Sequence, residues 1–167
     1  DVDLANTFNT SYDKYLDMIY KKTGSLIEAA AKAAAILAGL DENKYALYGK
    51  NLGVAFQMID DILDITQDSQ TLGKPAMLDF VDGKVTIPYL LLHERLENKT
   101  KLEALYKKEL SAEESLWIKE QMNITKALED SITQAKEIGN IAINAVKDEK
   151  DSETLVFIMK AMIEREF

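Results

Sequence analysis

The sequence predicts an all-α protein, a helical bundle, on three observations. Only seven glycines and two prolines interrupt 167 residues, so few positions break a helix. Alanine, leucine, glutamate and lysine, which are strong helix formers, dominate long stretches. Apolar residues recur at helical spacing, and no stretch alternates as a half-buried strand does. With 47% hydrophobic residues the chain can bury one core, so we expect residues 1–167 to form a single helical domain.

Composition also excludes several classes of function. A net charge of −9 argues against a nucleic-acid partner, because a phosphate backbone requires a basic stripe. The absence of cysteine excludes disulfides and thiolate metal sites, and it agrees with a cytoplasmic location. The longest apolar run, residues 85–92, is far shorter than the roughly 20 residues of a transmembrane helix. The chain begins with Asp1 and no signal segment follows, so we expect an N-terminal region to be missing.

The first elements follow from apolar spacing and breakers. Residues 12–20 show the i, i+3, i+4 rhythm of an amphipathic helix, which Gly24 is expected to interrupt. The alanine-rich run 26–40 resumes the helix, and its small side chains favour either close packing or the lining of a tunnel. Gly39 is typical of a helix end, and Asp41 of the N-cap of the next helix.

The strongest helical pattern spans residues 45–66, and the longest irregular stretch, 68–83, follows it. Long ordered loops in compact domains are often functional. Residues 85–98 form the next predicted helix, with Pro88 in its first turn, and residues 102–110 a short one.

The remaining helices are predicted from their caps. Ser111 and Glu114 form a capping box that opens a helical region, which breaks near Asn123 and continues to Val146. Ser152 begins the final helix. Its apolar residues are expected to share one face, namely Leu155, Ile158, Met159, Met162 and Ile163.

The helix over residues 45–66 carries two separate stripes. Four apolar residues fall within roughly 60° of arc and are expected to form the packed face. They are Leu52, Phe56, Ile59 and Leu63. A second group, centred about 120° away, is polar and acidic. It consists of Gln57, Asp60, Asp61 and Asp64.

The acidic stripe predicts a magnesium site. Like charges at i and i+4, such as Asp60 and Asp64, cost roughly 0.2–0.5 kcal/mol, and a solvated helix face usually mixes charge signs. Carboxylate oxygens suit Mg²⁺, which also takes water and phosphate oxygens. An acidic solvent face is the alternative for this pattern alone. Lys22, Lys74 and Lys84 favour a diphosphate, because ammonium groups and Mg²⁺ together neutralise that leaving group.

These residues also carry a family resemblance. The segment 49–92 resembles the second aspartate-rich region of trans-type polyprenyl diphosphate synthases. Its core is the Phe-Gln-x-x-Asp-Asp-x-x-Asp of residues 56–64, followed by Leu-Gly-Lys at 72–74 and Asp-Gly-Lys-x-Thr-x-Pro at 82–88. Residues 20–26 look like the Lys-Thr segment on a kinked helix, and residues 164–167 also look family-like. The resemblance implies the C-terminal part of an isoprenoid synthase fold.

The resemblance implies roles for single residues. Asp60 would hold Mg²⁺ directly, and Asp61 and Asp64 would support it directly or through water. Lys22 and Lys74 would contact the allylic diphosphate, and Lys84 would join them when the loop closes. Thr23 and Gln57 would stabilise the developing carbocation. Asp79 occupies a position where the family often has an aspartate, with a supporting role that stays open.

The implied reaction condenses an allylic diphosphate with isopentenyl diphosphate in a Mg²⁺-dependent prenyl transfer. Relatives of this kind carry another aspartate-rich motif and several arginines in their first half, whereas this chain has no second Asp-Asp pair and only Arg95 and Arg165. We therefore expect a fragment with negligible turnover by itself, and a homodimer when intact. The alternatives are a non-catalytic helical partner subunit of a heteromeric synthase and a terpene cyclase.

Overall fold

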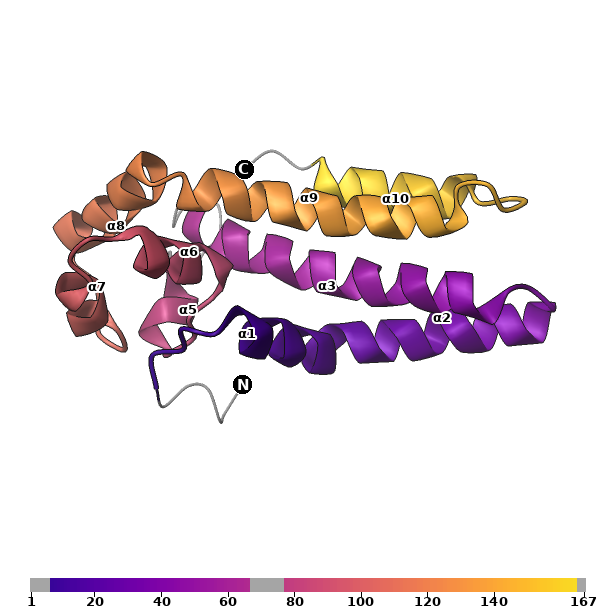
Figure 1. Ribbon diagram of the computed structural model, residues 1–167, viewed down its shortest axis with the longest axis horizontal. Helices are drawn as coiled ribbons and strands as arrows, with labels where there is room; N and C mark the ends of the chain where they lie inside the picture. Colours follow the sequence, from indigo (N-terminus) through magenta and orange to yellow (C-terminus); the bar gives the residue numbers. More distant parts are fainter. Residues whose placement is uncertain (1–6, 67–76, 165–167) are drawn as a thin grey trace. The chain divides into compact units, whose positions relative to one another are not determined.

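The computed structural model describes residues 7–66 and 77–164, and it is helical without any β-strand in these two ranges (Figure 1). The prediction of an all-α protein is thereby confirmed. In chain order the elements are α1 (Tyr12–Ile19), the π-helix η1 (Tyr20–Gly24), α2 (Ser25–Ala38), α3 (Glu42–Thr66), α5 (Leu78–Val81), α6 (Ile87–Arg95), α7 (Thr100–Leu105), α8 (Ala112–Ile124), α9 (Ala127–Val146) and α10 (Glu153–Ile163). None of the described helices is long and apolar enough to span a membrane.

The chain divides into two compact units. Of the described residues, 7–15, 60–66 and 77–132 form the first unit, and 16–59 and 133–164 form the second. The helices α1, α3 and α9 each contribute to both units. The single helical domain over residues 1–167 stays a prediction.

In the second unit, α2 and α3 are joined by a tight turn (Figure 1). Gly39 adopts a left-handed conformation with φ of 69°, and the N–H of Leu40 donates to the carbonyl of Ala35. Asp41 Oδ1 accepts the N–H of Asn43 at 3.0 Å. The predicted helix end at Gly39 and the cap at Asp41 are therefore confirmed.

The helix α10 packs in the second unit through Met159, Met162 and Ile163, which are buried. A Cβ placed on Gly139 of α9 would lie 2.5 Å from Ile163, so only glycine allows this approach. The expected common face of α10 is only partly observed, because Ile158 is 46% exposed.

The first unit contains α5 to α8. The capping box is confirmed, with Glu114 N–H donating to Ser111 Oγ at 3.2 Å and Ser111 N–H donating to Glu114 Oε2 at 2.8 Å. Pro88 lies in the first turn of α6, as expected. The helix α5 falls inside the stretch that we expected to be irregular, and its Phe80 ring stacks on Tyr89 at a centroid distance of 4.3 Å.

Candidate active site

The packed face of α3 differs from the expected one. Phe56 is 45% exposed, and Leu52 and Leu63 are only half-buried, whereas Ile59 is buried as expected. The residues that bury the helix instead are Val54, Ala55, Met58, Ile62 and Ile65. Because α3 has apolar residues on several sides, its periodicity does not single out the side that packs.

The acidic stripe is divided between the surface and the interior. Asp60 is exposed, while Asp61 and Asp64 retain only 3% and 5% of their accessible surface. A buried carboxylate requires hydrogen bonds to offset its lost hydration. Asp61 and Asp64 obtain those bonds from different segments of the first unit.

Tyr15 of α1 holds Asp61. The Tyr15 hydroxyl is fully buried and donates a hydrogen bond of 2.8 Å to Asp61 Oδ2. Burial, followed by the Asp61 carboxylate, raises the pKa of Tyr15 well above its usual value, so this hydroxyl remains a neutral donor. Tyr15 therefore orients the second carboxylate of the acidic stripe.

Asp64 joins the end of α3 to the segment that begins at Met77. Its Oδ2 atom accepts the backbone N–H of Asp79 at 3.1 Å, and its carbonyl accepts the N–H of Met77 at 2.8 Å. Met77 reaches this position with a left-handed backbone, at φ of 61°. Such a conformation is uncommon for a residue with a side chain, and here the two bonds to Asp64 support it.

Lys84 is held by Asp79. Its ammonium donates to Asp79 Oδ1 at 2.5 Å, and its backbone N–H donates to the Asp79 carbonyl at 2.8 Å. Burial lowers the pKa of Lys84, but the Asp79 carboxylate, with smaller contributions from Asp82 and Asp61, outweighs burial and leaves this pKa above its usual value. The Lys84 side chain is thus a cation within the electrostatic reach of Asp61.

In the second unit, the π-helix η1 places Thr23 against α3. The N–H of Ser25 donates to the carbonyl of Tyr20, so the chain continues through a wide turn where we expected Gly24 to interrupt the helix. Thr23 Oγ1 donates to Gln57 Oε1 at 3.2 Å. Single π-turns inside α-helices are frequently found at functional sites.

Glycine permits this approach of η1 to α3. A Cβ placed on Gly53 would lie 2.6 Å from the Cα of Gly24, closer than two such atoms can pack. Two backbones therefore meet directly beside the Thr23–Gln57 hydrogen bond. Lys22, the neighbour of Thr23, is exposed.

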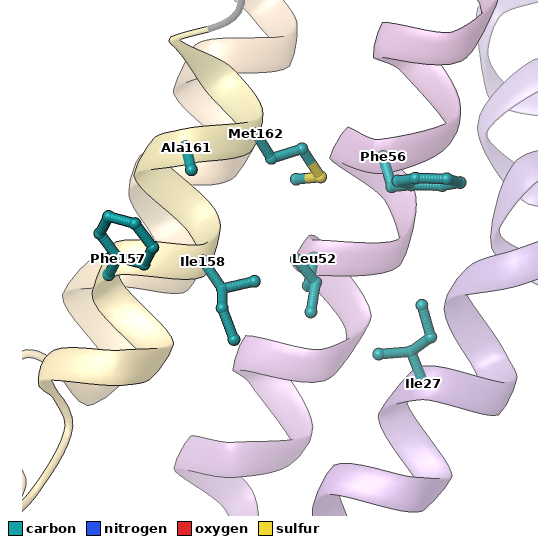
Figure 2. Close-up of a pocket in the computed structure, with 7 residues that line it drawn as sticks. All are labelled: Ile27, Leu52, Phe56, Phe157, Ile158, Ala161 and Met162. Carbon is teal, nitrogen blue, oxygen red and sulfur yellow. The ribbon is translucent and has the colours of Figure 1, made fainter.

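An apolar groove lies in the second unit, between α2, α3 and α10. Figure 2 shows Leu52 and Phe56 of α3, with Ile27 of α2 on one side of them and α10 on the other. Its volume is about 440 Å³. The residues that line it are Ile27, Leu52, Phe56, Phe157, Ile158, Ala161 and Met162. Phe56 precedes Asp60 by one helical turn, so an apolar ring and an exposed carboxylate lie on the same side of α3.

The predicted site residues thus fall into two groups. The first unit brings Asp61 and Asp64 into one network with Lys84, and the second unit pairs Thr23 with Gln57. Lys74 and residues 165–167 lie outside the described residues. Within ranges 7–66 and 77–164, no three carboxylate or imidazole groups converge on a ready-made metal site. Mg²⁺ typically uses one or two carboxylates with water and phosphate oxygens, so the exposed Asp60 fits such an ion.

Tyr15 is a site residue that sequence reasoning missed. Its apolar ring follows the helical rhythm of α1, and no local pattern links it to Asp61, which is 46 positions away. The sequence gives Asp79 no defined role, and the structure shows that its backbone N–H binds Asp64 and its carboxylate binds Lys84.

The fold and this site define a class of protein: an all-helical protein with the isoprenoid synthase fold seen in polyprenyl synthase structures. The family model described as polyprenyl synthetase matches residues 1–125. The chain belongs to this family.

Individual proteins of known name that resemble this chain are prenyl transferases and polyprenyl diphosphate synthases. A prenyl transferase of Cyanidium caldarium is 42% identical over 158 residues, which are 87% of this chain and 47% of that protein. The octaprenyl diphosphate synthase of Haemophilus influenzae is 35% identical over 164 residues, 89% of this chain and 47% of that protein. The crystal structure of octaprenyl pyrophosphate synthase from Helicobacter pylori superposes with a TM-score of 0.90 at 40% identity, covering 99% of this chain and 57% of that one. The chain therefore spans about half the length of these relatives.

Proposed function

We propose that the protein carrying this chain is a Mg²⁺-dependent prenyltransferase that condenses an allylic diphosphate with isopentenyl diphosphate. The observation that carries the proposal is the order of side chains on α3. Phe56 lines an apolar groove, Gln57 accepts from Thr23, and one turn later Asp60 is exposed. Such a helix matches an amphiphile with a hydrocarbon chain and an anionic head.

The side chains have distinct tasks in this reaction. Asp60, supported by Asp61 and Asp64, would hold Mg²⁺, which supplies charge neutralisation for the departing diphosphate. Lys22, Lys74 and Lys84 would bind the same oxygens as point charges.

The chemistry is an ionisation followed by an addition. The allylic carbon–oxygen bond breaks and its electron pair leaves with diphosphate, and the double bond of isopentenyl diphosphate then attacks the cation. A proton lost from the adduct restores a double bond and passes to the released diphosphate. The oxygens of Thr23 and Gln57, which already form a hydrogen bond at 3.2 Å, would stabilise the cation.

Replacing Asp60 with alanine tests the proposal. We expect kcat/KM of the intact enzyme to fall by about 100-fold or more, because a metal contact contributes several kcal/mol and about 1.4 kcal/mol corresponds to tenfold. Radiolabelled isopentenyl diphosphate incorporation measures this rate. The thermal stabilisation of the protein by inorganic pyrophosphate in Mg²⁺ buffer should fall in parallel.

The matched control is Asp148→Ala, which removes an exposed aspartate outside this region. It should leave both readouts unchanged, and circular dichroism should confirm that both variants fold. An Asp60→Ala enzyme that turns over at the wild-type rate would refute the metal role and with it the proposed function.

Two further proposals concern the oligomeric state of the intact protein and the activity of these 167 residues alone. We propose a cytoplasmic homodimer for the intact protein, which sedimentation can test, and negligible turnover for the 167 residues alone. The latter rests on the single Asp-Asp pair and on the two arginines of the sequence. Product formation by this chain alone at rates normal for prenyltransferases would contradict it.

A further inference from the structure

In the first unit, Asp79 forms hydrogen bonds with both Asp64 and Lys84. Its backbone N–H donates to the Asp64 carboxylate, and its own carboxylate accepts from the Lys84 ammonium. Its backbone carbonyl also accepts the N–H of Lys84. One bond to Asp64 and two bonds to Lys84 therefore connect the acidic end of α3 to this lysine through Asp79.

The turn between Asp79 and Lys84 is itself well anchored. The N–H of Gly83 donates to the carbonyl of Phe80, and Tyr106 donates to the carbonyl of Gly83 at 2.6 Å. Gly83 has a positive φ of 88°, which glycine adopts without strain. Because the backbone of the turn is held at both ends, the remaining freedom of Lys84 is the rotation of its long side chain.

We propose that Asp79 is a positioning residue, which holds the Lys84 ammonium beside the acidic end of α3 and so pre-orients it for the substrate diphosphate. This inference rests on the proposed function, in which Lys84 binds that diphosphate. In this inference Asp79 does not touch the substrate and affects its binding only by orienting Lys84.

The donor count of an ammonium group supports this role. Lysine has three N–H donors, and Asp79 Oδ1 accepts one of them. The others can donate to phosphate oxygens without breaking the bond to Asp79. The lysine side chain is also among the most flexible, so ordering it before substrate binds lowers the entropic cost of binding.

A purely structural salt bridge is the competing interpretation. The two side chains retain 29% and 22% of their accessible surface, so both are largely covered but still contact water. Ion pairs near the surface contribute little to stability. Loss of Asp79 should therefore affect substrate binding far more than folding.

The test is a double-mutant cycle on the intact protein, with Asp79→Ala, Lys84→Ala and the double variant. We expect Asp79→Ala to lower kcat/KM for the allylic diphosphate by about tenfold, and Lys84→Ala by at least as much. In the Lys84→Ala background, Asp79→Ala should have no further effect. The Kd of inorganic pyrophosphate in Mg²⁺ buffer, measured by calorimetry, should follow the same pattern without requiring turnover.

Two further variants keep the test decisive. Asp79→Asn keeps the size and the backbone bond to Asp64, so it should fold even if the alanine variant does not, and its effect should be weaker. The control is Asp130→Ala, which removes the carboxylate of another ion pair of the first unit, the more exposed one with Arg95 at 2.7 Å. Its kcat/KM should equal that of the wild type.

The outcomes separate this inference from the proposed function. A wild-type rate for Lys84→Ala would remove Lys84 from the site and refute the inference, while the role of Asp60 would stand or fall on its own test. An impaired Lys84→Ala with an unimpaired Asp79→Ala would overturn the positioning role alone. Equal losses from Asp79→Ala in both backgrounds would also overturn it, because Asp79 would then act independently of Lys84.

Discussion

Both units of this chain bury mainly apolar side chains, and they differ in the exceptions. The first unit buries carboxylates, and Asp61 and Asp64 are nearly inaccessible there. Among the described residues, large apolar side chains are exposed in both units, and those of the second unit are more numerous. They include Leu26, Ile36, Leu37, Leu40, Leu47, Phe56, Ile141, Phe157 and Ile158. Burial in this protein therefore depends on whether a side chain finds a partner, and its polarity alone does not decide.

The contacts that hold α3 also differ between the two units. In the first unit, hydrogen bonds from Tyr15 and Asp79 hold the carboxylates of α3. In the second unit, the backbone of Gly24 packs directly against that of Gly53 in α3. Polar bonds tolerate small displacements, whereas close-packed backbones cannot accept even one added carbon.

Gly53→Ala should produce the largest change in stability. The added Cβ would lie 2.6 Å from the Cα of Gly24, and separating two backbones should cost about 3 kcal/mol, the upper end for overpacking. The higher helix propensity of alanine offsets only about 0.5–1 kcal/mol. Urea denaturation followed by circular dichroism measures the difference. Asn51→Ala, a change on the same helix, is the control and should stay within about 0.5 kcal/mol of the wild type.

Tyr15→Phe should have the next largest effect. It removes the hydroxyl that donates to the buried Asp61, and a buried acceptor that loses a bond costs about 1–2 kcal/mol. The same denaturation experiment measures it, with the half-buried Tyr45→Phe as the control. If both variants were equally stable, the bond between Tyr15 and Asp61 would not contribute to the stability of the first unit.

The capping box of α8 should have the smallest effect, since it is local and exposed. Ser111→Ala removes the acceptor for the N–H of Glu114 and should cost about 0.5–1 kcal/mol. The backbone N–H of Ser111, followed by its hydroxyl, lowers the pKa of Glu114. A lowered folded-state pKa contributes stability above the usual glutamate value of about 4.3, and this contribution is lost as the pH falls through the folded value.

Denaturation midpoints between pH 7 and pH 3 measure the dependence on Glu114. Glu114→Gln should flatten the acid limb of the stability curve by a small amount. Glu113→Gln is the control, because Glu113 is exposed and takes no part in the capping box. An equal flattening by both substitutions would contradict the assignment.

Much of the fold was predictable because its determinants are local. Gly39, Asp41 and the pair Ser111 and Glu114 act within one helical turn, and the structure confirms all of them. The all-α class and the family also follow from the residues, since composition, apolar spacing and the aspartate-rich motif are written in the chain.

Tertiary structure alone decided which side of α3 is packed and how its aspartates are held. Tyr15 meets Asp61 across 46 positions and Asp79 meets Asp64 across 15, and no local pattern encodes partners at such separations. The same holds for the exposed Phe56, whose surroundings depend on helices that fold back from elsewhere in the chain. Helix propensity acts over neighbouring residues, whereas the free energy of burial depends on every group that the fold brings together.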